Sequence, residues 1–481
     1  MSSVRDLTPN PSVIAGRVNG NQVGGSTRML HGPTGELVAH VSLCGTGDVD
    51  AAVEAATDAQ PAWRRTPAPR RGEVLSRAAA LLAQHRGEFA TAITLEEGKT
   101  LREAGAEVDR AIDYLSFFGA EGWRLAGQEF ANLEPNLRIT SRREPLGVVG
   151  LITPWNFPLA IPAWKVGPAL VAGNAVILKP ALEAPGPSVL LAELLESAGL
   201  PPGVLNVLVG DGGTIGAAVV AHPGVHAISF TGSTQVGRQI AAVCGQRMAR
   251  VQLELGGSNA TVVLDDADPA SAADVIARSA FGLTGQACTA TSRVYCTPGI
   301  ASSLVEALVA RARSLRLGDG SDPSSDIGPL VSVAAHERVA AIVDTAVGEG
   351  AVRHAARAAA PPFFEPTVLT GLPPDARIFE TEVFGPVVAV VEVSGLEEAI
   401  ACVNASRYGL VASILTNSLS AAQTFTDEVR AGTVKVNETT TGNQPNVPFG
   451  GLKDSSNAAF KEQGAVALDF YTVSKSIYLR W

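Results

Sequence analysis

The sequence predicts an α/β protein with parallel sheets covered by helices. Short apolar runs rich in β-branched residues, such as 145–154 and 175–180, alternate with stretches whose apolar residues recur every three or four positions. After residue 257 the same alternation begins again. A chain of 481 residues is also too long for a single core. We therefore expect two or three domains, of which two are α/β.

The individual elements follow from these patterns in chain order. Amphipathic helices are expected at 48–59 and 72–100, and the arginine cluster 64–71, which includes Arg71, is expected at a solvated helix start. Buried strands are expected at 145–154, 175–180, 203–210, 227–233, 260–266 and 292–297, with helices at 160–174, 185–203 and 268–282. Residues 131–145 and 467–481 alternate apolar and charged positions, which is typical of exposed strands that pair with another chain.

The composition argues against several classes of protein. The net charge is −10, from 37 basic and 47 acidic residues, which disfavours binding to nucleic acid or to an anionic membrane. Five cysteines without a CxxC pair argue against a disulfide framework and for a reducing compartment. No secretory signal and no unbroken apolar stretch of about 18 residues is present, so a cytoplasmic protein is expected.

Cys288 is the first candidate for chemistry. It stands in GQACTATSR, residues 285–293, between a glycine and a polar run. A cysteine nucleophile requires thiolate character, a donor for the oxyanion that it creates, and an acid or base for the second half-reaction. A small buried residue without a chemical role would fit the same stretch. The other groups of the chain therefore decide whether Cys288 is a nucleophile.

Two further stretches supply such groups. VQLELGGSNA places Glu254 in an apolar strand, where a carboxylate is costly to bury unless it has a partner or acts as a base with a raised pKa. LITPWNFPLA places Asn156 just past a strand end, where its amide could donate to an oxyanion. The structural alternatives are an edge-facing or salt-bridged Glu254 and an Asx-turn at Asn156.

A phosphate site is the weaker indication. In SFTGSTQVG a strand leads to Gly232 and Ser233 and then to a helix that contains Val236, and helix starts of this kind bind phosphate. The glycines of VGDGGTIG do not have the spacing of a dinucleotide fingerprint. The histidines of HPGVH flank a proline and a glycine, which argues against a shared metal, and no metal site is expected.

Taken together, these stretches resemble the aldehyde dehydrogenase superfamily of non-phosphorylating, NAD(P)-dependent enzymes. The family motifs occur in order over almost the whole chain: TPWNFP, ILKP, FTGS, LELGG, GQACTATSR, FGPV preceded by Glu382, and PFGG. The resemblance implies a Rossmann-like cofactor domain, an α/β catalytic domain and a small β oligomerisation arm. It places them at 1–127 with 146–256, at 257–457, and at 128–145 with 458–481. It also implies a homodimer or homotetramer.

The resemblance assigns roles residue by residue. Cys288 matches the nucleophile, Asn156 the oxyanion donor together with the Cys288 N–H, and Glu254 the base that activates water. For the cofactor, NAD or NADP, Lys179 matches the contact to the adenosine ribose, Ser233 that to the pyrophosphate, and Glu382 that to the nicotinamide ribose. Phe384 matches the residue beside the nicotinamide. The cofactor groove also includes Ile152, Thr153, Pro154, Trp155, Gly212, Gly232, Val236 and Leu255.

The sequence departs from the family pattern at three positions. Leu182 replaces the glutamate by which many NAD-preferring members hold the adenosine 2′-hydroxyl, and Glu183 comes one residue later. NAD and NADP both remain open, because the repulsion of a 2′-phosphate is reduced. Among subfamilies the chain resembles the α-ketoglutaric and succinic semialdehyde dehydrogenases, but Trp164 and Gly282 stand where the succinic type often has arginines.

The expected function is oxidation of a small aldehyde, a semialdehyde or another polar aldehyde, to the carboxylic acid through a thiohemiacetal and a thioester. Aldehydes that are aromatic or carry a phosphonate or sulfonate are the alternative. A CoA-acylating enzyme would typically lack Glu254, and a cysteine hydrolase would not need Lys179 or Glu382. A catalytically inactive relative would be expected to have lost Cys288, Asn156 or Glu254.

Overall fold

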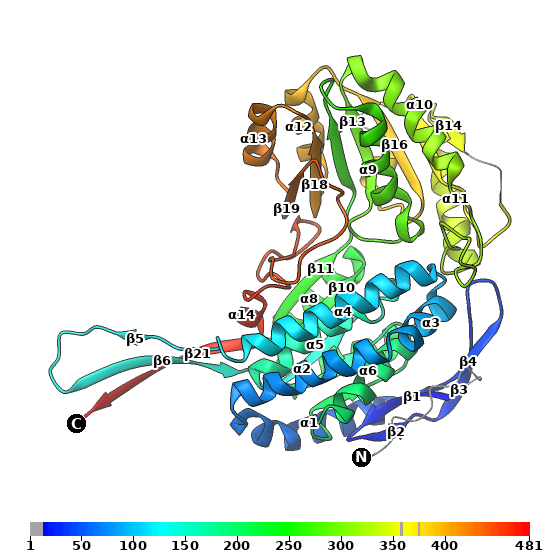
Figure 1. The fold of residues 1–481 in the computed structure, drawn as a ribbon. Helices are drawn as coiled ribbons and strands as arrows, with labels where there is room; N and C mark the ends of the chain where they lie inside the picture. Colours follow the sequence, from blue (N-terminus) through cyan, green and yellow to red (C-terminus); the bar gives the residue numbers. More distant parts are fainter. Residues whose placement is uncertain (1–12, 356–358, 374–375) are drawn as a thin grey trace.

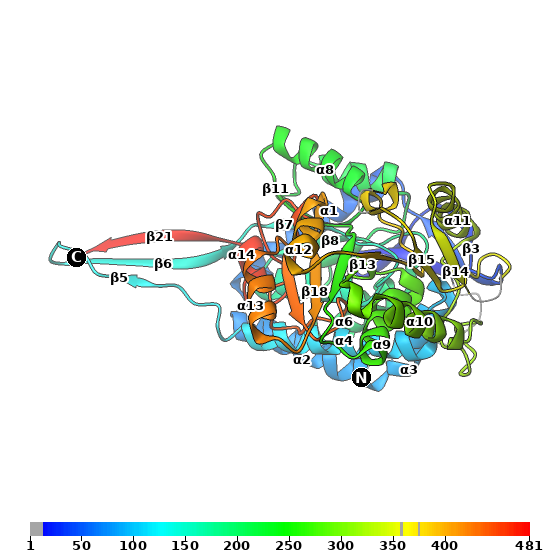
Figure 2. The same ribbon diagram turned by 90° about the horizontal axis from the view of Figure 1, so that it is seen from above.

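The computed structural model describes residues 13–355, 359–373 and 376–481. Two lobes, each built on a mostly parallel sheet, are stacked on one another, and a thin arm of strands projects from the lower lobe (Figure 1). Seen from above, the arm extends well beyond both lobes and ends near the C-terminus (Figure 2). The predicted α/β class is confirmed.

The lower lobe contains a nine-stranded sheet. In chain order the strands are β1 (Val13–Val18), β2 (Asn21–Val23), β3 (Ser26–His31), β4 (Leu37–Leu43), β7 (Val148–Ile152), β8 (Ala175–Lys179), β9 (Leu205–Val207), β10 (Ala227–Gly232) and β11 (Arg250–Leu255). The order across the sheet is β11-β10-β7-β8-β9-β1-β4-β3, and β2 pairs with β1. The strands from β11 to β9 run parallel, so their carboxyl ends lie along one edge of the sheet.

Helices cover both faces of this sheet. They are α1 (Thr46–Arg65), α2 (Ala68–Gln84), α3 (Arg86–Glu97), α4 (Leu101–Glu121), α5 (Ala160–Ala172), α6 (Gly186–Ser197), α7 (Ala217–Ala221) and α8 (Thr234–Gln246). Alternate residues of β7 face opposite cores: Val149 and Leu151 pack with α2 to α6, and Val148 and Ile152 pack with α1, α7 and α8. This alternation explains why the strand is apolar throughout.

Two expectations for the helices are wrong in detail. The helix expected at 72–100 is two helices that meet at His85, and it ends at Gly98, which has φ 95°. Arg71 is not solvated but 5% exposed, and its guanidinium donates to the carbonyl oxygen of Val171 at 2.9 Å. It therefore bridges α2 to the end of α5 rather than facing water.

The upper lobe contains a seven-stranded sheet in the order β14-β15-β16-β13-β12-β18-β19. In chain order the strands are β12 (Asn259–Val263), β13 (Thr291–Cys296), β14 (Val352–Ala355), β15 (Thr367–Thr370), β16 (Val387–Glu392), β18 (Val411–Leu415) and β19 (Thr433–Val436). The helices are α9 (Pro269–Phe281), α10 (Pro298–Ser314), α11 (Val333–Gly348), α12 (Leu396–Ala405) and α13 (Leu419–Glu428). Helices α9 and α10 cover one face, and α11, α12 and α13 cover the other.

The arm is a three-stranded antiparallel sheet of β5 (Glu129–Phe130), β6 (Leu137–Pro145) and β21 (Thr472–Arg480), in the order β21-β6-β5. The expected ribbon at 131–145 thus pairs with the C-terminal strand. Residues 467–471, expected to continue that strand, instead form the short helix α14 (Ala467–Tyr471) against the lower core. A small antiparallel pair, β17 (Tyr408–Gly409) and β20 (Leu452–Lys453), completes the strands.

Among the residues that the structure describes, no helix is both long enough and apolar enough to cross a membrane.

Candidate active site

Cys288 lies on a loop between α9 and β13. Leu283 and Thr284, at the start of this loop, both have φ 54°, a backbone conformation that is uncommon for residues with a side chain. Cys288 is half-buried and packs against the apolar cluster that contains Phe449. The amide of Asn259, on β12, donates to the carbonyl oxygen of Cys288 at 2.8 Å. The upper sheet therefore holds the cysteine loop in place.

Asn156 follows β7 in the lower lobe and is 3% exposed. One N–H of its amide donates to the carbonyl oxygen of Gln286 at 2.8 Å. This bond joins the lower lobe to the cysteine loop two residues before Cys288. An asparagine amide carries two N–H groups, so a second donor remains for an oxygen bound near the thiol.

Glu254 lies in β11 and is 3% exposed. Its Oε2 accepts the N–H of Gly451 at 3.2 Å, whereas Oε1 has no hydrogen-bond partner among the described residues. Burial raises the pKa of Glu254 well above its ordinary value, and the charge of Glu462 adds to this effect. A Cβ at residue 450 would collide with Oε1, so Gly450 lets the chain pass close to the carboxylate. A buried carboxyl group with one unpartnered oxygen suits a general base.

The pKa of the Cys288 thiol depends on its burial and on the carboxylates around it. Burial raises the pKa of Cys288, and the negative charges of Glu382, Glu254 and Glu462 raise it further. The resting thiol is therefore protonated at neutral pH. Its proton must leave before the sulfur can attack, and the carboxylates nearby are the groups able to accept it.

A buried polar network stands behind Glu254, and the sequence analysis did not identify it. Lys165, on α5, forms an ion pair with Glu462, and both side chains are at most 2% exposed. Lys165 also donates to Ser229 Oγ at 2.7 Å, and the indole of Trp164 donates to Glu462 at 2.8 Å. A lysine within the otherwise apolar stretch 160–172 was the signal that could have revealed it.

The expected adenosine end of the groove contains Lys179 and Gly212. Lys179, at the end of β8, is 5% exposed, and burial lowers its pKa. A Cβ at residue 212 would lie 4.0 Å from Lys179 Nζ, so the glycine and the ammonium are neighbours. The hydroxyls of Thr153 and Thr231, at the carboxyl ends of β7 and β10, are buried and find no partner in the described part of the chain. Unpaired hydroxyls and a buried ammonium at the carboxyl ends of these strands fit a ligand with phosphate and ribose oxygens.

Ser233 begins α8, as the sequence analysis expected. Its hydroxyl oxygen accepts the N–H of Val236 at 3.4 Å and so caps the helix, while the hydroxyl proton remains for another acceptor. Val236 is 41% exposed, whereas Leu255 is buried at the end of β11, where a Cβ at residue 237 would collide with its side chain. Gly232 precedes the cap and ends β10.

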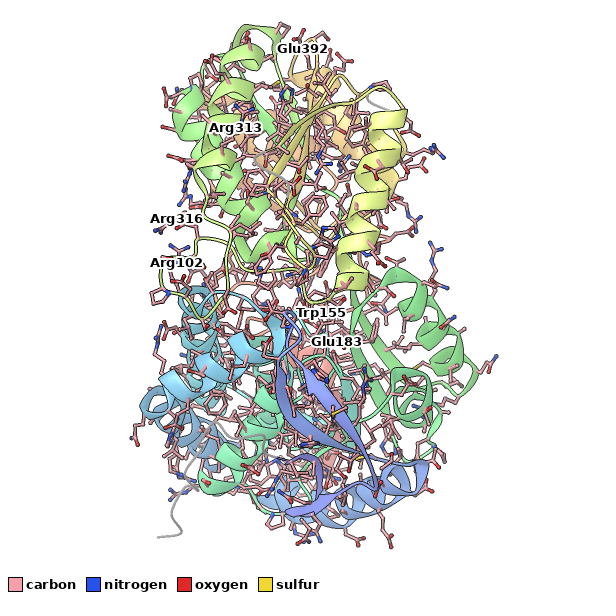
Figure 3. The ribbon with its side chains drawn as sticks, turned by 90° about the vertical axis from the view of Figure 1, so that its right-hand side faces the viewer. Arg102, Trp155, Glu183, Arg313, Arg316 and Glu392 are labelled. Atoms are coloured by element: carbon pink, nitrogen blue, oxygen red, sulfur yellow. The ribbon has the colours of Figure 1, made fainter. Side chains whose placement is uncertain are left out.

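The expected nicotinamide end brings Trp155, Phe384 and Glu382 together. The rings of Trp155 and Phe384 meet edge to face, with centroids 5.5 Å apart. Glu382 accepts the N–H of Gly257 at 3.2 Å, and burial raises the pKa of Glu382 to about 7. Trp155 lies where the two lobes meet (Figure 3). Ile152 is buried at the end of β7, and Thr153 and Pro154 lead from it to Trp155.

Within residues 13–355, 359–373 and 376–481, no group of three or more His, Cys, Asp and Glu side chains is arranged to hold a metal ion. In the HPGVH stretch, His222 Nδ1 instead accepts the N–H of Gly224 at 3.0 Å, which is a local turn contact.

Comparison with known proteins agrees with this geometry. The family model "Aldehyde dehydrogenase family" matches residues 21–477. The α-ketoglutarate semialdehyde dehydrogenase of Haloferax volcanii is 45% identical over 98% of this chain and 99% of its own length. The 2,5-dioxopentanoate dehydrogenase of Saccharolobus solfataricus is 42% identical over 92% of this chain and 94% of its own. The phenylacetaldehyde dehydrogenase of Pseudomonas fluorescens is 40% identical over 98% and 96%.

Solved structures show the same fold. The NAD⁺ complex of an aldehyde dehydrogenase from Bacillus cereus superposes with a TM-score of 0.94 at 34% identity, over 97% of this chain and 96% of that one. An NADP-dependent enzyme of Escherichia coli superposes equally well, with a TM-score of 0.94 at 33% identity over 97% and 98%.

The two-lobed α/β fold and the family match together define the class as dinucleotide-dependent oxidoreductases of aldehydes. This chain belongs to the aldehyde dehydrogenase family. It is an NAD(P)-dependent aldehyde dehydrogenase, which oxidises an aldehyde with NAD or NADP as acceptor.

Proposed function

We propose that Cys288 is the catalytic nucleophile, that the second N–H of Asn156 and the backbone N–H of Cys288 hold the oxyanion, and that Glu254 is the base. One observation carries this assignment above the others. The Asn156 amide donates to the carbonyl oxygen of Gln286, two residues before Cys288, so the donor is linked directly to the loop that carries the thiol. Glu254 supports it in two ways. One of its buried oxygens has no hydrogen-bond partner among the described residues, and its negative charge raises the pKa of the Cys288 thiol.

The reaction follows from these groups. The Cys288 thiol gives up its proton to a carboxylate, and the sulfur adds to the aldehyde carbon, so that the carbonyl oxygen becomes an oxyanion between the two N–H donors. A hydride leaves this carbon for the nicotinamide ring when the cofactor is bound, and a thioester remains. Glu254 then takes a proton from water, the hydroxide adds to the thioester carbon, and the carboxylic acid leaves as the thiol re-forms.

The cofactor groove runs along the carboxyl ends of the lower sheet. Lys179 and Gly212 are proposed to hold the adenosine ribose, the start of α8 at Ser233 the pyrophosphate, and Glu382 the nicotinamide ribose. The edge-to-face pair of Trp155 and Phe384 is proposed to flank the nicotinamide. The remaining proposed contacts are Ile152, Thr153, Pro154, Gly232, Val236 and Leu255.

NADP use is proposed alongside NAD. Leu182 packs against the lower core and offers no carboxylate to the adenosine ribose, and the exposed Glu183 is the nearest acidic residue in the sequence. A purified sample assayed with each cofactor in turn tests this: comparable kcat/KM values support dual use. A strong preference for NAD would mean that Glu183 replaces the missing carboxylate.

A semialdehyde with a distal carboxylate is the proposed substrate, and two of the relatives above are named for such aldehydes. Trp164, in place of an arginine, forms an aromatic wall with Tyr114 and Phe449, with ring centroids 5.4 and 6.3 Å from its own. Phe449 belongs to the cluster against which Cys288 packs, so the wall leads to the thiol.

The far end of this wall carries positive charge. Arg110 lies one turn before Tyr114 on α4, is about one-third exposed, and has its closest carboxylate, Asp113, at 3.9 Å. Lys435 lies near it: burial and the charge of Arg110 both lower the pKa of Lys435, against the effect of Glu438. Arg110 is therefore the proposed partner of a distal carboxylate, in place of the two missing arginines.

The test is cofactor reduction against a panel of aldehydes, with the variant Arg110→Met. The panel contains α-ketoglutaric and succinic semialdehydes, phosphonate- and sulfonate-bearing aldehydes, and neutral aliphatic and aromatic ones. For a semialdehyde we expect Arg110→Met to raise KM by about 10- to 100-fold, as the loss of one charged hydrogen bond predicts. The KM of neutral aldehydes should change little. Arg102→Met, on the outer surface of the same helix beside Arg316, is the matched control (Figure 3).

Aromatic aldehydes are the second candidate. The wall of Tyr114, Trp164 and Phe449 would also accept a phenyl ring, and the phenylacetaldehyde dehydrogenase relative supports this. Activity on neutral or aromatic aldehydes alone would overturn the semialdehyde proposal and leave the dehydrogenase assignment intact.

A homodimer or homotetramer in the cytoplasm is the proposed state of the protein. Large apolar residues stand exposed on the arm, with Leu133 fully exposed and Tyr478 68% exposed. The sheet membership supports a division into a cofactor domain (1–127 and 146–256), a catalytic domain (257–457) and an oligomerisation arm (128–145 and 458–481).

A further inference from the structure

A buried ion pair lies directly behind the loop that carries Asn156. The ammonium of Lys99 donates to Glu107 Oε2 and to the backbone carbonyl oxygen of Asn156, both at 2.7 Å, and lies 4.5 Å from the ring centroid of Phe157. Both charged side chains are 1% exposed. Burying two charges is unfavourable unless geometry and hydrogen bonds compensate, so this pair calls for a reason beyond stability.

The second oxygen of the carboxylate supplies part of that reason. Glu107 Oε1 accepts the backbone N–H groups of Leu159 and Ala160, at 2.9 and 3.0 Å, where α5 begins. The first N–H groups of a helix have no partner within the helix and attract a negative charge. Lys99 thus holds the carbonyl at one end of the segment 156–160, and Glu107 holds the amides at the other.

The same helix also contacts the cysteine loop. Glu103, one turn before Glu107 on α4, accepts the N–H of Leu283 at 2.8 Å. Leu283 is one of the two residues with φ 54° at the start of the loop that leads to Cys288. The first two turns of α4 therefore attach to both segments that form the oxyanion site.

We propose that Lys99 and Glu107 are positioning residues that set the amide of Asn156 relative to Cys288. This inference rests on the oxyanion role proposed above for Asn156. Neither residue touches the substrate: each acts through the backbone of the segment 156–160. A shift of about 1 Å in a catalytic donor can lower a rate by about 100-fold, so a clamp on both ends of a short segment has a large effect.

The charge of Lys99 persists at working pH. Burial alone lowers the pKa of Lys99, but the carboxylates of Glu107 and Glu97 outweigh it and the net pKa is raised. The three carboxylates that face the ammonium are Glu107 at 2.7 Å, Glu97 at 3.7 Å and, farther away, Glu103. The ammonium of Lys99 therefore keeps its charge at neutral pH.

The alternative is that the pair only stabilises the fold, and two variants separate the possibilities. Lys99→Met removes the donor to Asn156 with a side chain of similar length. Glu107→Gln keeps an acceptor for α5 and loses the charge that holds Lys99. Glu121→Gln is the matched control, because Glu121 is a buried, paired carboxylate at the other end of α4, bonded only to Arg124 among the described side chains.

Three quantities are measured on the full-length enzyme: the rate of hydride transfer to the cofactor in the first turnover, the alkylation rate of Cys288 by iodoacetamide, and the Kd for the oxidised cofactor. We expect both variants to slow hydride transfer by about 10- to 100-fold, whereas the alkylation rate and the Kd should stay within about threefold of the parent values. Alkylation needs no oxyanion donor, so a positioning defect spares it. An unchanged rate of hydride transfer in both variants would overturn the proposal, and so would equally large defects in hydride transfer, alkylation and cofactor binding.

A double-mutant cycle with Asn156→Ala makes the test specific. Asn156→Ala should slow hydride transfer by about 100- to 1000-fold, as removal of one oxyanion donor does in other enzymes. Lys99→Met should then add little in the Asn156→Ala background, because both changes act through one amide. Additive losses would show that Lys99 acts elsewhere. If Asn156→Ala alone left the rate intact, the proposed role of Asn156 would fail, and that outcome is distinct from failure of the clamp.

Discussion

At the scale of single residues, the site is dominated by buried acids whose protons are hard to remove. Burial raises the pKa of the Glu254 carboxyl and of the Cys288 thiol, and it raises the pKa of Glu382 to about 7. A raised pKa means that the neutral form persists to higher pH than in water. Both the attack by sulfur and the activation of water therefore become easier as pH rises.

The raised pKa of the Cys288 thiol leads to a prediction for its reactivity. Alkylation of Cys288 by iodoacetamide, without cofactor, should accelerate steadily as pH rises and should not level off below about pH 8.5, the ordinary thiol pKa. Mass spectrometry of the modified peptide measures it, with Cys288→Ala as the control for the half-buried Cys402. A plateau near neutral pH would mean that an unrecognised cation stabilises the thiolate.

Glu254 leads to a kinetic prediction. Glu254→Gln keeps the shape of the side chain but cannot take a proton from water, so the thioester should form and then persist. Stopped-flow detection should record an initial burst of reduced cofactor followed by turnover about 100- to 10,000-fold slower than the parent, the range of general base catalysis. Slow turnover without a burst would contradict a role confined to the second half-reaction.

At the scale of elements, the loop that carries Cys288 has an unusual backbone. Gly285 has φ 67°, and a Cβ there would lie directly against the carbonyl oxygen of Gly385. The cysteine loop can therefore approach the segment that carries Glu382 only because residue 285 is a glycine.

Substitution at this position tests the loop. Gly285→Ala should destabilise the protein by about 1–3 kcal/mol, through left-handed backbone and the clash with Gly385, and should lower activity. Gly282→Ala is the control from the same loop, because residue 282 has φ −55° and open space around a Cβ. Thermal unfolding measures both, and equal Tm values for the two variants would contradict the role of Gly285.

Element boundaries were the least predictable part of the fold. The periodicity of 72–100 continues across His85 because α2 and α3 both bury one face in the same core. Pattern alone therefore could not locate the break. Likewise, 467–471 has a strand-like alternation, but its apolar residues pack as a helical turn under α5.

At the scale of the whole molecule, the arm is the feature that a single chain does not explain. Its strand β21 pairs with β6 on one side, and Tyr478 and Leu479, which point to opposite faces, are 68% and 56% exposed. Exposed apolar side chains on both faces of a strand favour contact with another copy.

The oligomer prediction follows. The double variant Tyr478→Glu, Leu479→Glu should shift the protein toward smaller assemblies in size-exclusion chromatography with light scattering, because charge would have to be buried at the contact. Ser476→Glu, an exposed polar position on the same strand, is the control. An unchanged mass for the double variant would mean that the arm is not part of the interface.

The sequence by itself determined the α/β class and the family, and it predicted roles for Cys288, Glu254 and Asn156, because those residues stand in short motifs that are local in the chain. The tertiary structure alone decided how they are held. Lys99 meets the backbone of Asn156, and Lys165 meets Glu462, across dozens or hundreds of residues. Periodicity and motif spacing describe neighbours in sequence, whereas a buried charge is stabilised by whichever partner the folded core brings to it.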